Sequence, residues 1–191
     1  MSTIRATIVL LSLAIASSSF LGSAQALDLY FRHFETGADF ADQVYANIDD
    51  CWTQRRINSA GFRDATRIGK FFHDQKIPVS RVVSSPFCRT WQSADLAFGH
   101  HERVDALKIL PSKDDTLEQN ATMKAGLMPF ISAEPAAGTN VVVMAHDDNL
   151  TAAGGPLLDV QGEAAVIKAD GKGGFSVVAK LKPGQWTLLA K

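Results

Sequence analysis

The chain has 191 residues, of which 46% are hydrophobic and 20% charged, and its formal net charge is −1. This length and composition suit one globular domain with a core of its own. The balanced charge, with no basic stripe or tail, argues against a nucleic-acid-binding protein.

The first 26 residues have the layout of a secretory signal peptide. Arg5 precedes an apolar stretch from 6 to 21, and the segment 22–26 ends in an A-x-A pattern, which predicts cleavage after Ala26. An uncleaved membrane anchor is the alternative, although the apolar run is short for a span. We therefore expect a periplasmic or secreted protein with a single domain, residues 27–191, and no membrane span after cleavage. The sequence leaves the oligomeric state open.

Three apolar segments, 27–31, 82–88 and 140–145, have the length and the β-branched or aromatic character of buried strands. The first runs into Arg32 and His33, the second into Arg89 and the third into His146. Ligands of open α/β sheets bind just beyond the carboxyl ends of the strands. We therefore expect two arginines and two histidines to converge on one crevice.

Helical signals fill the intervals between these strands. Asn58 or Ser59 can cap a first helix. Its apolar positions recur at helical spacing: Phe62, Ala65, Ile68, Gly69 and Phe72. Residues 90–98 predict a second helix that ends at Gly99. The stretch 36–54 has no clear period and predicts a loop over the crevice.

The second half of the chain continues the alternation. Asp114 and Asp115 favour the start of a third helix through its dipole. One apolar face of that helix is formed by Leu117, Ala121, Met128 and Ile131. A short helix after His146 should stop at 154–156, and the tail predicts a hairpin from 163–168 and 175–181. The expected fold is α/β, a three-layer αβα arrangement with a mainly parallel sheet and a C-terminal hairpin.

The residue types at the crevice suit phosphate chemistry. Arginine offers paired hydrogen bonds to phosphate or carboxylate oxygens, and histidine can attack phosphorus or carry a proton. An alkoxide is a poor leaving group near neutral pH, so a carboxylic acid must protonate it. Asp147, directly after His146, is the nearest candidate.

Three short motifs resemble the histidine phosphatase superfamily, which contains phosphoglycerate mutases and histidine acid phosphatases. Arg32-His33 with Glu35-Thr36 resembles the family's opening motif, and Ser85-Pro86 ahead of Arg89 resembles its middle motif. His146-Asp147 followed by Asn149 is similar to the acid phosphatase branch. Residues 51–55 and 61–63 resemble small exported bacterial members, so that the likeness spans the mature chain.

The resemblance implies a phosphoglycerate mutase-like fold and a small phosphorylated substrate. His33 would be the phosphorylated nucleophile, with Arg32, Arg89 and His146 around the phosphate. Thr36 and Asn149 would also bind phosphate, and Asp147 would be the acid. In the mutase-like branch the acid is a glutamate between the middle arginine and the second histidine, and Glu118 is the alternative here. The implied function is an exported phosphomonoesterase that works through phosphohistidine without a metal or other cofactor.

One departure keeps other functions open. Phe34 replaces the glycine of the family's motif, and a phenyl ring there could narrow or reshape the pocket. A non-catalytic member that only binds phosphate or another anion is therefore one alternative. A phosphomutase is another, although such enzymes usually need capping insertions that this short chain lacks.

Two further features bear on chemistry. Export favours a disulfide between Cys51 and Cys88, and two free buried thiols are the alternative. His100, His101 and Glu102 are adjacent, but no further ligand has convincing spacing, so we expect no metal site.

Overall fold

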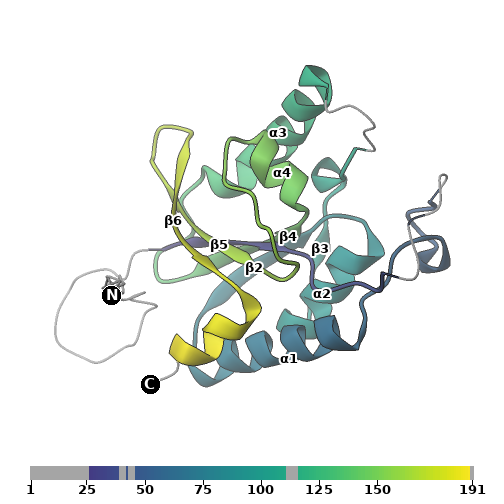
Figure 1. Cartoon of the computed structure of the whole chain (residues 1–191). Coiled ribbons are helices and arrows are strands. Elements are labelled where there is room, and N and C mark those ends of the chain that lie inside the picture. The colour runs from purple at the N-terminus through teal and green to yellow at the C-terminus, as the bar shows by residue number, and fades with distance from the viewer. Residues whose placement is uncertain (1–25, 39–41, 43–45, 111–115, 190–191) are drawn as a thin grey trace, which may run out of the picture.

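The computed structural model describes residues 26–38, 42, 46–110 and 116–189. The sequence interpretation of residues 1–25, and of Asp114 and Asp115, falls outside these ranges. Within them, a six-stranded sheet lies between two layers of helices (Figure 1). The three-layer α/β arrangement expected from the sequence is therefore confirmed.

The strand order in the sheet is β3-β2-β4-β1-β5-β6. Strands β1 (Asp28–Arg32), β2 (Val79–Ser84), β3 (Glu102–Arg103) and β4 (Asn140–Ala145) run parallel. Strands β5 (Ala164–Ala169) and β6 (Phe175–Leu181) form the C-terminal hairpin, in which β5 pairs antiparallel with β1 and β6 pairs antiparallel with β5. Because β1 and β4 are neighbours, their carboxyl ends lie side by side.

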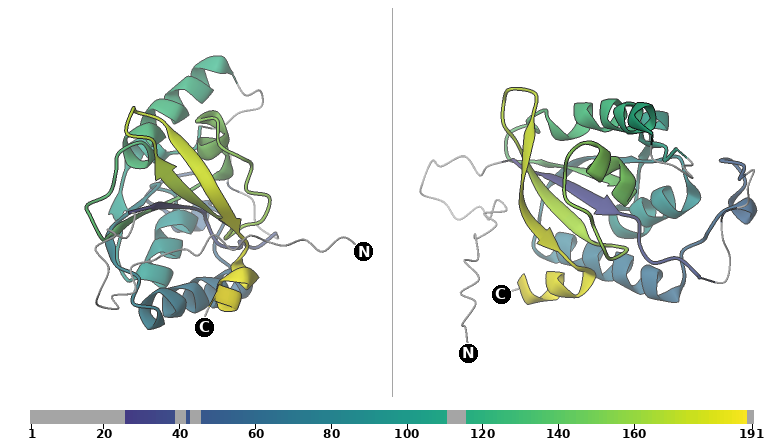
Figure 2. Two further views of the ribbon diagram at one scale, coloured as in Figure 1. Left: turned by 90° about the vertical axis from the view of Figure 1, so that its left-hand side faces the viewer. Right: turned by 45° about the horizontal axis from the view of Figure 1, so that its top comes forward.

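One face of the sheet is covered by α1 (Ser59–Asp74) and α2 (Cys88–Phe98), together with the C-terminal 3₁₀ helix Pro183–Leu189 (Figures 1 and 2). The Asn58 side chain caps α1 by accepting hydrogen bonds from the backbone of Ala60 and Gly61. Trp186 is fully buried against Phe31, Phe71 and Phe72, and this aromatic cluster fixes the layer to the sheet.

The other face is covered by α3 (Leu117–Ile131) and α4 (Asp147–Ala152). Thr116 and Gln119 form a reciprocal capping box at the start of α3. Leu127 and Ile131 of α3 pack with Leu150 of α4 on the sheet. The short helix α4 begins directly after β4, so His146 stands at the junction between strand and helix.

Several local expectations were wrong. Leu117 is 90% exposed and Ala121 is exposed as well, whereas Ile131 is buried as expected, together with Met123 and Leu127. Phe62 of α1 is also exposed. The second strand ends at Ser84, so Arg89 lies in the first turn of α2 and not at a strand exit. Pro86 has no backbone N–H and suits the break between β2 and α2.

Candidate active site

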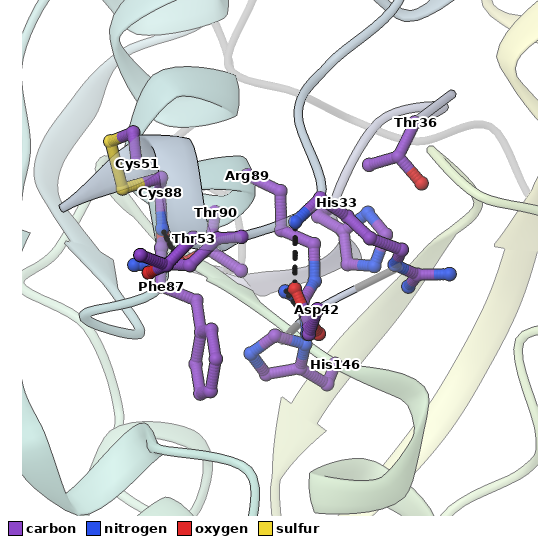
Figure 3. A network of polar contacts seen from close by, with 12 residues as sticks. His33, Thr36, Asp42, Cys51, Thr53, Phe87, Cys88, Arg89, Thr90 and His146 are labelled. Atoms are coloured by element: carbon purple, nitrogen blue, oxygen red, sulfur yellow. Dashed lines mark hydrogen bonds and ion pairs between the residues drawn. A yellow bond between two sulfur atoms is a disulfide. The ribbon is translucent and has the colours of Figure 1, made fainter. Parts of the chain in front are cut away.

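The two histidines meet at the carboxyl ends of the central strands. His33 follows β1 and His146 follows β4, and the backbone N–H of His33 donates to the carbonyl of Ala145 at 3.0 Å. The two ring centroids are 5.6 Å apart with an interplanar angle of 68° (Figure 3). The convergence expected from the strand exits is thus present for both histidines.

The ring of His33 has a defined tautomer. Its Nδ1 lies 2.8 Å from the carbonyl oxygen of Phe34. A carbonyl oxygen can only accept a hydrogen bond, so Nδ1 carries the hydrogen of the neutral ring. The lone pair is therefore on Nε2, which is the atom that could attack phosphorus.

The ring of His146 is fixed by its surroundings. Its Nε2 lies 3.0 Å from the hydroxyl oxygen of Ser85, and the Phe87 ring packs against it edge-on at 5.3 Å between centroids. The hydroxyl of Tyr30 donates to the backbone carbonyl of His146. Ser85 is therefore also a residue of the site. It belongs to the Ser85-Pro86 motif of the sequence, which by itself gave Ser85 no role.

Both histidines are held neutral. Burial lowers the pKa of His33 well below its usual 6.5, and the positive charges of Arg89, Arg55 and Arg32 lower it further, against a raising effect of the Phe34 carbonyl. Burial also lowers the pKa of His146 well below 6.5, followed by the charge of Arg89 and contact with His33. An unprotonated His33 is the form that a nucleophile requires.

Arg89 reaches the histidines from the first turn of α2 and is only 3% exposed. Its Nη1 donates to both carboxylate oxygens of Asp42 at 3.1 Å, and the two side chains lie against each other in Figure 3. Its Nε is buried and has no hydrogen-bond partner among the described residues. Burial lowers the pKa of Arg89 to about 10, although the Asp42 carboxylate opposes this effect. A buried guanidinium with a free N–H favours binding of a further anion.

Arg32 is oriented by the segment after α4. Its Nη1 donates to the carbonyls of Leu158 at 2.8 Å and Asp159 at 3.2 Å. Its Nε forms an ion pair with Asp147 at 3.2 Å. The structure therefore places the Asp147 carboxylate beside Arg32, and its role as the acid stays a prediction.

The other predicted site residues lie differently. Thr36 is buried, and its hydroxyl donates to Gln161 at 3.1 Å. Asn149 is fully buried in α4, and its amide has no hydrogen-bond partner among the described residues. Glu118 is exposed in the first turn of α3. Within the described part of the chain, none of the three forms a hydrogen bond or ion pair with His33 or Arg89.

Phe34 does not narrow the pocket. Its ring is fully buried in the core beside α1 and α2, 6.2 Å from Phe31, and its backbone N–H donates to the Ser93 hydroxyl at 3.0 Å. Its φ is not positive, so the position does not need glycine. The ring instead packs against Gly162, where a Cβ would lie 2.7 Å from the Phe34 Cδ1 atom. The glycine needed for close packing is thus at 162.

A loop anchored by a disulfide borders the site. Cys51 and Cys88 are bonded, with Cα atoms 5.6 Å apart, which confirms the predicted disulfide. The buried side chain of Gln54 accepts a hydrogen bond from the Cys88 backbone at 2.8 Å. These contacts hold the loop against the first turn of α2, next to Arg89.

Sequence reasoning missed two charged residues near the histidines. Asp42 lies in the stretch without periodicity, where nothing distinguishes it from its neighbours. Arg55 belongs to the segment 51–55, whose resemblance to exported relatives was the available signal. In the described ranges, no group of three histidine, cysteine, aspartate or glutamate residues could hold a metal ion. No helix in those ranges is long and apolar enough to cross a membrane.

Comparison of the sequence gave no relatives: no protein-family model matches it, and no curated protein matches it. Solved structures do match. The protein histidine phosphatase SixA, complexed with tungstate, is 17% identical with a TM-score of 0.60, and the match covers 83% of this chain and 98% of SixA.

Two further phosphatases resemble the chain over most of their length. Phosphoserine phosphatase from Entamoeba histolytica is 12% identical, with a TM-score of 0.60 over 82% of this chain and 97% of its own. A mycobacterial glucosyl-3-phosphoglycerate phosphatase is 11% identical, with a TM-score of 0.56 over 79% and 96%. The chain therefore has the phosphoglycerate mutase-like fold of the histidine phosphatases.

Proposed function

We propose that this protein is an exported phosphomonoesterase that hydrolyses a small phosphate ester through a phosphohistidine intermediate. The observation that carries the proposal is the pairing of His33 Nδ1 with the Phe34 carbonyl, which leaves the Nε2 lone pair available. The neutral state of both histidines supports it, and so does the buried Nε of Arg89, which has no hydrogen-bond partner in the described part of the chain. The solved structures that share this fold are phosphatases, and this supports the proposed reaction class by analogy.

In the first step, Nε2 of His33 forms a bond to phosphorus as the bond from phosphorus to the ester oxygen breaks. Asp147 gives its proton to that oxygen, and an alcohol leaves. Arg89, Arg32 and His146 stabilise the charge on the remaining phosphoryl oxygens. In the second step, water attacks phosphorus, Asp147 takes the proton of the water, and phosphate and neutral His33 are released.

The geometry favours Asp147 over Glu118 as the acid. Asp147 contacts Arg32, which binds phosphate in this proposal, whereas Glu118 is exposed on α3 without a recorded contact to the pocket. A phosphate bound by the Arg32 guanidinium would bring its ester oxygen towards Asp147, because Asp147 is paired with Arg32. The burial of Phe34 in the core removes the main argument for a non-catalytic binder.

Export is supported by the signal-peptide layout of residues 1–26 and by the disulfide, because such bonds persist mainly in oxidising compartments. The mass of the protein recovered from the periplasm or medium tests this part. A chain that starts at Leu27 is expected, and full-length protein confined to the cytoplasm would contradict it.

The test of the reaction is replacement of the nucleophile. His33→Ala should lower turnover of an aryl phosphate by at least about 1000-fold, because the variant lacks the nucleophile that forms the covalent intermediate. Wild-type protein mixed with labelled substrate and quenched should carry an acid-labile, alkali-stable phosphate, and His33→Ala should carry none.

The matched control is His73→Ala, since His73 is an exposed histidine on α1. It should keep normal turnover and labelling. Near-normal turnover of His33→Ala, or label on a hydroxyl side chain, would refute the proposed mechanism. Phosphate binding without any turnover by the wild type would identify a binder instead.

A further inference from the structure

Residues 54–57 follow the 3₁₀ turn Cys51–Thr53, and contacts on two sides hold this segment in place beside the pocket. The disulfide and Gln54 hold it to the first turn of α2. Ile57 forms an antiparallel bridge with Thr36, and the backbone of Gly37 donates to the carbonyl of Arg56 at 3.1 Å. Arg55 therefore lies between the helix that carries Arg89 and the segment that follows His33.

Arg55 and Arg89 reach the same carboxylate. The backbone N–H of Arg55 donates to Oδ1 of Asp42 at 2.7 Å, and Nη1 of Arg89 lies 3.1 Å from that same oxygen. Figure 3 shows Asp42 against Arg89. A carboxylate thus already occupies an anion position that both residues share.

The charge of Arg55 acts on the reactive groups. It lowers the pKa of His33 and of His146, and in both cases its effect ranks above that of Arg32. It also lowers the pKa of Arg89 by repulsion, where burial is the larger cause. The backbone of Arg55 rests on the carboxylate that Arg89 also binds, so its charge stands on the loop next to the pocket.

No structural role is evident for the side chain of Arg55. Among the described residues it has no recorded hydrogen bond or ion pair, although it is partly buried. Its neighbour Arg56 is different, because that guanidinium stacks over the exposed Trp52 ring at 4.4 Å from the centroid. Three arginines gathered around two neutral histidines repel one another, and an anion bound between them would offset this cost.

We infer that Arg55 is a third phosphate-binding arginine, supplied by the disulfide-anchored loop, in addition to Arg32 and Arg89. This inference rests on the proposed phosphatase function and extends it to a residue outside the strand-end motifs. A third guanidinium adds charge-assisted hydrogen bonds to the phosphoryl oxygens and favours the phosphate dianion over the monoanion. Asp42 must give up its place on Arg89 when phosphate binds.

Equilibrium binding of inorganic phosphate tests the inference without relying on turnover. Calorimetric titration of the whole mature protein should show that Arg55→Ala weakens phosphate binding by about 10- to 100-fold, the usual range for a charge-assisted hydrogen bond. Arg55→Lys keeps the charge but loses the planar fork, so its loss should be smaller. Arg56→Ala, which removes the same charge one residue away, should stay within about twofold of the wild type.

The pH profile separates direct action from a structural role. The charged groups that lower the pKa of His33 are Arg89, Arg55 and Arg32. The His146 ring lies beside His33, and Asp42 forms an ion pair with Arg89. Removing one positive charge raises the pKa of His33 towards its usual value, so the acid limb of kcat/KM should move to higher pH in Arg55→Ala. Arg55→Lys should leave the limb unchanged.

The outcomes are distinct. If Arg55→Ala binds phosphate as the wild type does, within about twofold, the inference is wrong even when the enzyme is active. If Arg55→Ala does not fold, Arg55→Lys and Arg55→Gln decide, because Lys keeps the charge on a long side chain and Gln keeps the apolar stem and a polar end without the charge. A wild type without turnover refutes the proposed function, and the phosphate titration then still reports on Arg55.

Discussion

Asp147 is the residue on which the chemistry of the leaving group depends. Its carboxylate forms an ion pair with Arg32. Asp147→Asn should therefore lower hydrolysis of alkyl phosphates by about 100-fold or more, since their alkoxides need a proton. Activated aryl phosphates leave readily without one and should be affected much less. The ratio of kcat/KM for the two substrates measures the effect.

Glu118→Gln is the control for this prediction, because Glu118 is the other carboxylate that the family resemblance suggests. It should leave the substrate ratio unchanged. If Glu118→Gln loses alkyl phosphate hydrolysis and Asp147→Asn slows both substrates equally, the general acid is Glu118 of α3 and not Asp147.

Single residues also mark how far sequence reasoning reaches. His33, His146 and Arg89 could be predicted to converge because apolar segments lead into each of them, and the fold brings all three together. Phe34 was misjudged, because one position cannot reveal that its ring points into the core against Gly162. Asp42 could not be predicted, since its role depends on a loop without periodicity.

At the scale of elements, the disulfide links the loop that holds Arg55 to helix α2. Its loop closure over a separation of 37 residues should contribute about 4 kcal/mol to the free energy of unfolding. Replacing both cysteines by serine should therefore lower Tm by roughly 8–16 °C. It should also weaken phosphate binding, because Gln54 and Arg55 lose their anchor.

Thermal melts with and without reductant provide the measurement. The double serine variant should be insensitive to reductant, whereas wild type should lose stability once the buried bond is reduced. Equal melting temperatures of wild type and variant would show that the loop is held by its other contacts alone.

Two elements show why helices were predicted less well than strands. The apolar segments in β1 and β4 could be recognised as buried strands from the sequence, whereas their order in the sheet comes from the structure. In α3 the exposed Leu117 precedes the buried Met123 and Leu127, and packing on the sheet decides the face. Strand β3 consists only of Glu102–Arg103 and is defined by its pairing with β2. No sequence pattern predicts this pairing.

For the whole molecule, Asp28 sets a pH dependence of stability. It lies at the start of β1, is 1% exposed, and neither carboxylate oxygen has a hydrogen-bond partner among the described residues. Burial raises its pKa from 3.8 to about 7. The folded state then holds its proton more tightly than the unfolded state, so the free energy of unfolding falls as pH rises from about 4 to about 7.

Asp28→Asn should remove this decrease in the free energy of unfolding, because asparagine does not titrate. Near pH 8 the variant should be more stable than wild type by about 2–4 kcal/mol, and near pH 4 the two should converge. Urea unfolding across this range measures the difference, in which contributions from the buried histidines cancel. Parallel pH profiles would mean that Asp28 is ionised at no cost, and this would falsify the burial argument.

The bond between Cys51 and Cys88 also makes a covalent ring that contains α1 and β2. A protease that cuts once anywhere inside this ring cannot release a fragment, because both new ends stay tethered through the sulfur atoms. Nicked protein would keep its apparent mass on a gel until reductant is added. Arg55 and Arg56 both lie within the ring, so even cleavage by trypsin beside the pocket would leave the helices and strands of the domain in one connected molecule.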